Sequence, residues 1–171
     1  MPDFDVIDFD AADSPGRGET APDFTRPLVT DEFWEDRSLS DVVADEGRTI
    51  LVFTSMIGAY TSKYVWDELA ERDWFDRADR IVGLSAATPY AISAFLDDND
   101  HPFAVFADPA NDVAGEYGIV HDLDGMEGIS EPRMAVFVLE PDLTVADAWV
   151  ADEWPEFPPY DDLEERFGLE A

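Results

Sequence analysis

Short apolar runs alternate with amphipathic stretches from residue 48 onward, and this alternation constrains the fold more than any other feature of the sequence. The runs at 49–54 (TILVFT), 80–85 (RIVGLS) and 103–106 (FAVF) are short and rich in β-branched or aromatic residues, which is typical of buried strands. Between them, apolar side chains recur at helical spacing, first from about Ser62 and then from Thr88, where a hydroxyl cap precedes a proline. This part of the chain is therefore predicted to run strand, helix, strand, helix, strand.

The rest of the chain extends the same pattern. A short helix is expected over 112–117, and the runs at 134–139 and 145–150, joined by a Pro141-Asp142 turn, predict a β-hairpin. Apolar residues at helical spacing over 160–167 predict a closing helix. The whole order predicts an α/β fold with a mixed central β-sheet flanked by helices, and it matches the thioredoxin fold with an insertion.

The charge of the chain is strongly one-sided. It has 171 residues, of which 41 are acidic and 10 basic, and the net charge is −31. Such a field repels phosphate backbones and anionic lipids, so neither nucleic acid nor a membrane is an expected partner. The acids are spread over the whole chain, and Lys63 is the only lysine. With 46% hydrophobic residues to form a core, this composition indicates a cytoplasmic protein of a halophile, in which salt screens the self-repulsion.

The N-terminal segment carries no targeting signal that we recognise. Residues 1–17 form an acidic tail without a basic start or an apolar signal core, and they end in a turn-rich Ser-Pro-Gly-Arg sequence. The domain proper is expected to span 18–171. The longest apolar run, 50–53, is far too short to cross a bilayer, so we expect a cytoplasmic protein.

The absence of cysteine excludes several kinds of site. There is no disulfide, no thiolate zinc site, no iron–sulfur cluster and no thiol nucleophile. Two histidines cannot form a three-histidine zinc site, and no glycine-rich nucleotide loop is present. The stretches 97–101 (DDNDH) and 121–125 (HDLDG) offer oxygen and imidazole ligands, but these are also ordinary loop residues, and the loop interpretation is favoured. We expect no metal and no cofactor.

Five blocks of sequence together carry a family resemblance. They are residues 18–24 (GETAPDF), 39–42 (LSDV), 82–91 (VGLSAATPYA), 107–119 (ADPANDVAGEYGI) and 133–139 (RMAVFVL). They resemble the peroxiredoxin family, the alkyl hydroperoxide reductase and thiol-specific antioxidant group. Each block is weak alone, but all five occur in the family's order, and the match reaches from Gly18 to about Phe167. The resemblance implies a thioredoxin-like fold of the peroxiredoxin type and descent from a thiol peroxidase.

The chain departs from this family at the catalytic motif. Peroxiredoxins carry P-x-x-x-T-x-x-C after the first core strand, and an ungapped alignment places Ser55 at the proline, Ala59 at the threonine and Ser62 at the peroxidatic cysteine. A gapped alignment of 58–61 (GAYT) with the family's G-A-F-T instead places Tyr64 at the cysteine. The ungapped alignment is preferred because it leaves the strand-to-helix spacing undisturbed. Neither alignment supplies a sulfur.

Two positions carry over from the family's active site. Arg133 matches the active-site arginine, and it is either an anion-stabilising group over the pocket of Ser62 or a structural partner of one of the many carboxylates. Ser62 is interpreted mainly as a helix N-cap, a role that the hydroxyl of Thr61 could share, and only secondarily as a catalytic serine. The candidate catalytic positions are thus Ser62 and Arg133, with Ser55, Ala59 and Thr61 in the same pocket.

The loss of the thiol decides the expected function. A serine hydroxyl is a far weaker acid than a thiol and a poor nucleophile toward peroxide, so thiol peroxidase chemistry is not expected. The first hypothesis is a non-catalytic binding or assembly paralogue, with cysteine-bearing relatives as possible partners. The alternatives are other chemistry in the Ser62/Arg133 pocket, or an anion- or metal-binding module that uses the acidic loops.

A homodimer is also expected. Family members commonly dimerise, and aromatic residues gather near the C-terminus of this chain, where they either pack on the domain or form an oligomer interface. They are Trp149, Trp154, Phe157 and Tyr160.

Overall fold

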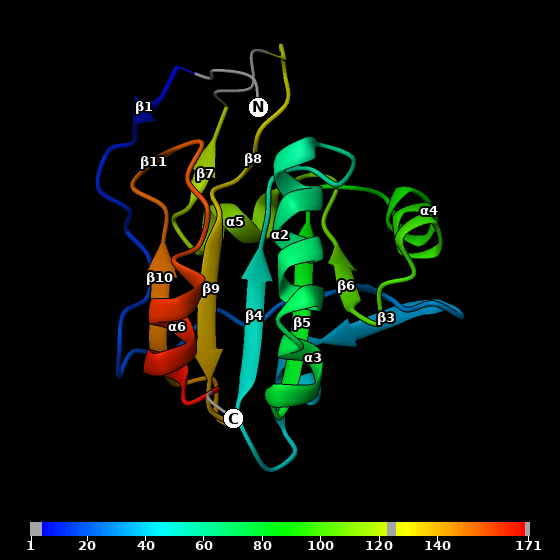
Figure 1. The fold of residues 1–171 in the computed structure, drawn as a ribbon, viewed down its shortest axis with the longest axis vertical. Coiled ribbons are helices and arrows are strands. Elements are labelled where there is room, and N and C mark those ends of the chain that lie inside the picture. The colour runs from blue at the N-terminus through cyan, green and yellow to red at the C-terminus, as the bar shows by residue number, and fades with distance from the viewer. Residues whose placement is uncertain (1–4, 123–125, 170–171) are drawn as a thin grey trace.

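A computed structural model describes residues 5–122 and 126–169. Its centre is a seven-stranded mixed sheet in the order β10-β9-β4-β5-β6-β2-β3, with helices against both faces (Figure 1). The strands are β2 (Thr25–Val29), β3 (Trp34–Ser38), β4 (Thr49–Phe53), β5 (Arg80–Ser85), β6 (Ala104–Ala107), β9 (Ala135–Leu139) and β10 (Val145–Val150). The helices are α1 (Leu39–Val43), α2 (Tyr60–Glu71), α3 (Trp74–Arg77), α4 (Pro89–Asn99), α5 (Asp112–Glu116) and α6 (Tyr160–Phe167).

The predicted fold class is confirmed as a thioredoxin-like α/β fold. Strands β4, β5 and β6 are parallel, while β9 is antiparallel to β4 and forms the predicted hairpin with β10. Helix α4 begins as expected, because Thr88 Oγ1 accepts a hydrogen bond of 3.2 Å from Ala91 N and Pro89 occupies the first turn. The β2–β3 hairpin was not predicted, because three of the five residues of β3 are charged and none is buried, so the strand lacks the apolar alternation of a half-buried strand.

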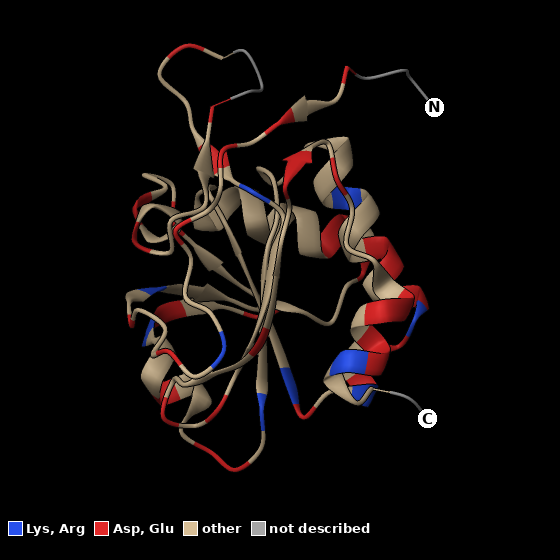
Figure 2. Cartoon of the chain, turned by 90° about the vertical axis from the view of Figure 1, so that its left-hand side faces the viewer, with Lys and Arg blue, Asp and Glu red and all other residues tan. Residues whose placement is uncertain are grey.

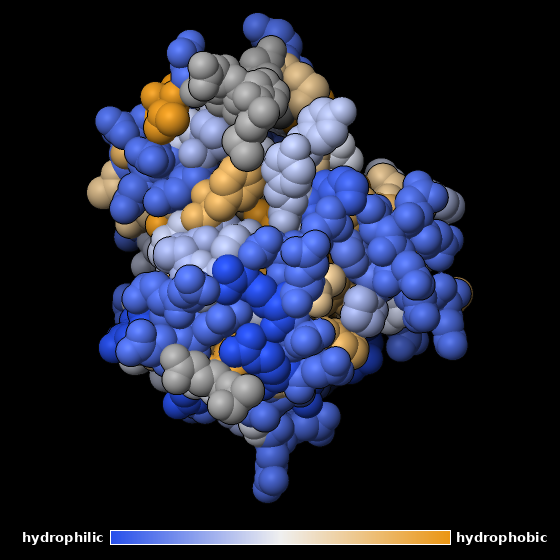
Figure 3. Space-filling model, viewed as in Figure 1, coloured by the Kyte–Doolittle hydropathy of each residue, from blue (hydrophilic) through white to orange (hydrophobic). Residues whose placement is uncertain are grey.

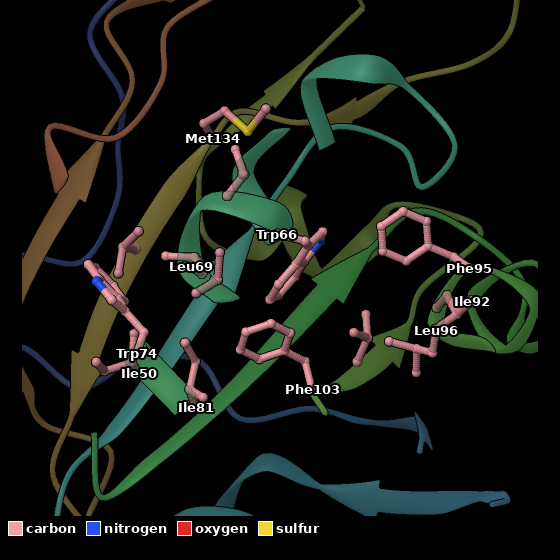
Figure 4. Packing of buried hydrophobic residues seen from close by; sticks show 14 of the residues in the cluster. Ile50, Trp66, Leu69, Trp74, Ile81, Ile92, Phe95, Leu96, Phe103 and Met134 are labelled. Atoms are coloured by element: carbon pink, nitrogen blue, oxygen red, sulfur yellow. The ribbon is translucent and has the colours of Figure 1, made fainter. Parts of the chain in front are cut away.

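The core lies on both faces of the sheet, and its two largest fully buried side chains are Trp66 of α2 and Trp74 of α3. Figure 4 shows Trp66 of α2 beside Phe103 over strand β5, and the centroids of the two rings lie 4.9 Å apart. Gly83 of β5 is required at this point. A Cβ atom there would lie 2.4 Å from Trp66 Cη2, far inside van der Waals contact.

The carboxylates are carried by the helices and loops, and the central strands are nearly free of charge (Figure 2). Within the described residues, eight of the ten basic side chains form ion pairs, and the two exceptions are Arg37 and Arg133. Most of the 41 acids therefore have no cationic partner.

The described part of the N-terminal segment lies along the domain. β1 (Ile7–Asp8) pairs antiparallel with β11 (Glu153–Trp154), and Phe9 N donates to Asp152 O at 2.8 Å. Further along, Gly118 has a φ of +70°, and a Cβ atom on it would lie 2.3 Å from Asp13 O, so this close approach requires glycine. The boundary at residue 17 stays a prediction, but residues 7–13 are in contact with the domain.

Three of the four C-terminal aromatic residues pack on the domain. Trp149, Phe157 and Tyr160 are partly buried against the core on the α2 face of the sheet. The apolar surface that this segment offers to another chain is correspondingly small. No helix in the described part of the chain is long and apolar enough to cross a membrane.

Candidate functional site

The positions matched to the peroxidatic motif lie in the loop after β4 and in the first turn of α2. The helix begins at Tyr60, two residues earlier than the sequence pattern indicates, and its N-cap is Ala59, which has an extended backbone and no side-chain cap bond. The predicted capping roles of Ser62 and Thr61 are therefore wrong. Both hydroxyls lie inside the first helical turn, past the position where a side chain can cap.

Ser62 is fully buried behind this turn. Its Oγ lies 3.1 Å from Thr54 Oγ1, and Thr54 Oγ1 donates its own proton to the carbonyl of Ser55 at 2.9 Å. Since a hydroxyl has only one proton, Ser62 must be the donor in its bond with Thr54. The Ser62 proton is thus used inside the protein, and the side chain does not reach solvent.

Ser55 and Thr61 form a second hydroxyl pair, with Oγ and Oγ1 2.5 Å apart. These two residues, unlike Ser62, line a small pocket beside the N-terminal end of α2, with room for about one water molecule. Its other walls include Phe9, His121 and the segment 153–157. Figure 3 shows hydrophobic residues gathered beside the upper end of α2, whereas the rest of this face is mainly hydrophilic.

Arg133 contacts the N-terminal segment. Its Nη2 donates to the Asp10 carbonyl at 2.8 Å, and its Cζ lies 4.3 Å from the centroid of the Phe9 ring. Nε and Nη1 are buried without a hydrogen-bond partner, and within the described residues no carboxylate lies within ion-pair distance. The described residues therefore give no support to the interpretation of Arg133 as a salt-bridge partner.

The electrostatic surroundings of Arg133 act in two directions. Burial lowers the pKa of the guanidinium from its ordinary value, while the negative charges of Asp10 and Asp152 act to raise it. No hydrogen bond joins Arg133 to Ser55, Thr61 or Ser62 in the part of the chain that the structure describes. That Ser62 and Arg133 form one pocket stays a prediction.

A buried histidine–carboxylate pair contacts the loop after β4, and sequence reasoning missed it. Glu131 accepts from Met56 N at 2.7 Å through Oε2, and its Oε1 lies 3.2 Å from His121 Nε2. The ring of His121 lies 5.1 Å from that of Phe9. The pair forms because His121 and Glu131 are opposite each other on β7 (Val120–His121) and β8 (Glu131–Pro132), a two-residue ladder with no periodic signal in the sequence.

The acidic loops do not assemble a ligand set in the described residues. His101, at the end of the 97–101 stretch, is buried and lies 3.0 Å from Asp67 Oδ1 on α2. Positions 123–125 of the other stretch lie outside the described residues. Among the residues that are described, no three His, Asp or Glu side chains are grouped so that they could hold a metal ion.

Comparison with known proteins identifies the fold and the family. Residues 17–148 match the AhpC/TSA family, which is more than half of the chain. The chain belongs to the AhpC/TSA family. Among solved structures, this AhpC/TSA protein is similar to the peroxidoxin BcpB of Mycobacterium tuberculosis, at 20% identity with a TM-score of 0.70, over 91% of this chain and 96% of the other.

Two further AhpC/TSA structures agree with this assignment. AhpC of Enterococcus faecalis gives a TM-score of 0.74 at 15% identity over 90% of this chain and 91% of its own, and the 2-Cys peroxiredoxin of Plasmodium vivax gives 0.69 at 13% over 90% and 95%. At these identities the likeness establishes a peroxiredoxin fold and no more. A search of curated proteins found no match. This AhpC/TSA protein contains no cysteine at all.

Proposed function

We propose that this AhpC/TSA protein is a non-catalytic binding or assembly paralogue rather than a thiol peroxidase. The observation that carries the proposal is the state of Ser62, the residue matched to the peroxidatic cysteine. This residue has no sulfur and is fully buried, and its hydroxyl donates a hydrogen bond to Thr54 Oγ1. A peroxidase of this family needs a thiolate that meets peroxide at the helix N-terminus, and neither condition is met at Ser62.

The surroundings support the same conclusion. The pocket beside Ser55 and Thr61 has space for about one water molecule, and the segment 153–157 forms one of its walls. Arg133, the matched arginine, is directed at Phe9 and Asp10. Chemistry of another kind at these hydroxyls is the second candidate, favoured only by His121, which lines the same pocket and has Glu131 behind it. The small size of the pocket leaves no room there for an organic substrate.

The partner in this proposal is a second copy of the chain, a cysteine-bearing member of the same family, or both. We further infer that the protein works in concentrated salt, because the net charge of −31 leaves most carboxylates without a cation. Light scattering in molar potassium chloride tests the self-association, with a mass of twice 19.1 kDa expected for a homodimer. A mass of 19.1 kDa would contradict it.

The test of the catalytic half of the proposal is peroxide consumption. Purified protein, supplied with hydrogen peroxide and either a small dithiol or a reduced thioredoxin, is expected to give the rate of a heat-treated control. A peroxidase rate above that control would refute the proposal. To test the proposed assembly with relatives, the protein is mixed with a purified cysteine-bearing AhpC/TSA protein in molar salt and studied by light scattering. The absence of a mixed species would exclude that relative as a partner.

A further inference from the structure

Strand β3 ends the seven-stranded sheet on one side, and the outward edge of β3 is a surface on which another chain could pair. The sheet order places β2 on one side of β3 and no strand on the other within the described residues. In Figure 1 the β2–β3 hairpin extends to the right beyond the rest of the sheet. An unpaired edge of this kind presents free N–H and C=O groups to another chain.

Two hydrogen bonds at the ends of the hairpin fix which groups are free. Thr30 N donates to Phe33 O and Leu39 N donates to Phe24 O, each at 2.9 Å. Because hydrogen-bonded and non-hydrogen-bonded pairs alternate along an antiparallel ladder, the main chains of Glu35 and Arg37 face β2. The main chains of Trp34, Asp36 and Ser38 therefore face outward. The position of Pro27 opposite Asp36 agrees, since proline has no N–H to give to β3.

The side chains along this edge carry an unusual unpaired cation. Arg37 is one of two basic residues without an ion pair in the described part of this highly acidic protein, and the other, Arg133, is buried. Glu35 is likewise outside every ion pair that the described residues form. Since residues two apart in a strand share a face, Glu35 and Arg37 project from the same side of the sheet.

We propose that β3 pairs antiparallel with β3 of a second copy, around a two-fold axis at Asp36, and so joins two sheets into one of fourteen strands. This inference rests on the homodimer proposed above and names its interface. In this register Trp34 lies opposite Ser38 of the second copy, and the outward-facing main chains form the hydrogen-bonded pairs. Glu35 of each copy then lies opposite Arg37 of the other copy. Both contacts are at non-hydrogen-bonded positions, where side chains come closest.

Charge selects this register from its neighbours. A shift by two residues in one direction places Glu35 opposite Glu35, and a shift in the other direction places Arg37 opposite Arg37. A shift by one residue sets outward-facing main chains against inward-facing ones. Charged edges normally prevent sheet-to-sheet pairing, and here the same charges allow it only in the one register where two of the three cross-strand contacts are attractive.

The third contact is repulsive, and it adds to the general repulsion between two chains that each carry a net charge of −31. Asp36 meets Asp36 of the second copy on the axis, and this repulsion is screened only when the Debye length is short, roughly 3 Å at 1 M salt. Exposed aromatic side chains next to the edge supply apolar surface for the contact. Phe33 and Tyr90 are 68% and 75% exposed, and Trp34 lies between them, with ring centroids 6.4 Å from Phe33 and 5.2 Å from Tyr90.

Charge reversal tests the interface directly, by light scattering and sedimentation in molar potassium chloride. E35R and R37E, each alone, place like charges opposite each other and are expected to weaken dimerisation at least tenfold. Mixing the two single variants restores opposite charges, so a heterodimer is expected. The double variant E35R/R37E regains the attraction within one chain and is expected to dimerise as the wild type does. R48E, which changes the charge by the same amount at an exposed site in the loop before β4, is the control.

The outcomes separate this inference from the proposal on which it rests. If the wild type is a monomer, the homodimer and its interface both fail. If the wild type and both single variants are dimers of equal strength, the homodimer stands and the β3 interface is wrong. Single variants that dissociate without rescue by mixing or by the double variant also overturn the register. Circular dichroism melting of each variant shows that the changes act on association rather than on folding.

Discussion

Ser62 Oγ donates its proton to Thr54 Oγ1 across 3.1 Å, and this bond lies in the interior, between two residues that do not line the pocket. Thr61, one residue earlier, lines the pocket with Ser55. Successive residues of a helix are about 100° apart around its axis, so the neighbour of a pocket residue is turned away from it. The residue that replaces the cysteine in the ungapped alignment is therefore not the one that faces the pocket.

A pair of cysteine substitutions tests this geometry. In Thr61→Cys the thiol is expected to react with a maleimide and, more slowly, with hydrogen peroxide to give a sulfenic acid, because the helix N-terminus favours a thiolate there. In Ser62→Cys the buried thiol is expected to react at least tenfold more slowly with both reagents. The measurement is mass spectrometry of the native protein over time.

Tyr64→Cys serves as the control for this pair. Tyr64 is 44% exposed, so its replacement should be labelled readily by maleimide whatever happens at the other two positions. Equal reactivity of the thiols at 61 and 62 would contradict the buried position of Ser62. If the Ser62→Cys thiol were oxidised by peroxide as fast as the Thr61→Cys thiol, peroxide would have access to position 62 after all.

The start of α2 shows where sequence reasoning succeeds and where it cannot. The strand that precedes it was predicted correctly, because five consecutive apolar or β-branched residues can only be buried. The first residue of the helix was misplaced, because Ala59 is the N-cap and alanine gives no capping signal. Ser62 is predicted to be the cap instead, because a serine before an apolar stripe is the usual sign of a helix N-cap.

The surroundings of Arg133 could not be predicted from sequence at all. Its contacts are with Phe9 and with the carbonyl of Asp10, more than 120 positions earlier in the chain. They exist because β1 pairs with β11, a ladder of two residues on each side. The His121–Glu131 pair likewise depends on the two-residue ladder of β7 and β8. Pairings this short depend on tertiary packing and leave no periodic pattern to read.

Asp147 is expected to stabilise the fold in a pH-dependent manner. Its Oδ1 accepts hydrogen bonds from Arg17 Nε of the N-terminal segment, at 3.2 Å, and from Arg166 Nη2 of α6, at 2.8 Å. Arg17 Nη2 also lies within ion-pair distance of Oδ2, at 2.9 Å. Burial alone raises the pKa of this carboxyl, but the hydrogen bonds from Arg17 and Arg166 outweigh burial and hold the pKa at about 2. The carboxylate form is thus favoured in the folded state, so its contribution is complete above the unfolded pKa of about 3.9 and is lost as the pH falls toward 2.

Asp147→Asn is therefore expected to lower the free energy of unfolding by about 2 kcal/mol at pH 7, with the difference from wild type shrinking below pH 4. Urea unfolding in molar salt at pH 7, 5, 4 and 3 gives the measurement. Asp162→Asn is the matched control, because Asp162 pairs with the same Arg166 but is largely exposed, and it should cost no more than about 0.5 kcal/mol. A difference from wild type that stays constant across the pH range would contradict the pKa argument.

Two glycines give a packing prediction of opposite sign. In Gly83→Ala the new methyl group would overlap the ring of Trp66, which is itself fully buried, so a loss of about 3 kcal/mol is expected. In Gly115→Ala the nearest atom is Val120 Cγ2 at 3.8 Å, an ordinary contact, and the residue lies in α5. There alanine is expected to be neutral or to stabilise by about 0.5–1 kcal/mol. Equal melting temperatures for the two variants would refute the close contact between β5 and α2.

Salt is expected to control the stability of the whole molecule. With a net charge of −31 and only eight basic side chains in ion pairs within the described residues, carboxylates on neighbouring helices and loops repel one another in dilute buffer. The Debye length falls from roughly 10 Å at 0.1 M to roughly 3 Å at 1 M, so this repulsion is largely removed in molar salt. Potassium chloride should therefore suffice without a strongly salting-out anion.

We expect the melting temperature to rise by at least ~10 °C between 0.1 and 3 M potassium chloride, equivalent to roughly 3–5 kcal/mol. Potassium sulfate at matched ionic strength separates the causes, because a rise seen only with sulfate would reflect salting-out of apolar surface rather than screening. A melting temperature that stays flat in chloride would remove the halophilic interpretation of the acids and would favour a basic partner for the acidic surface instead.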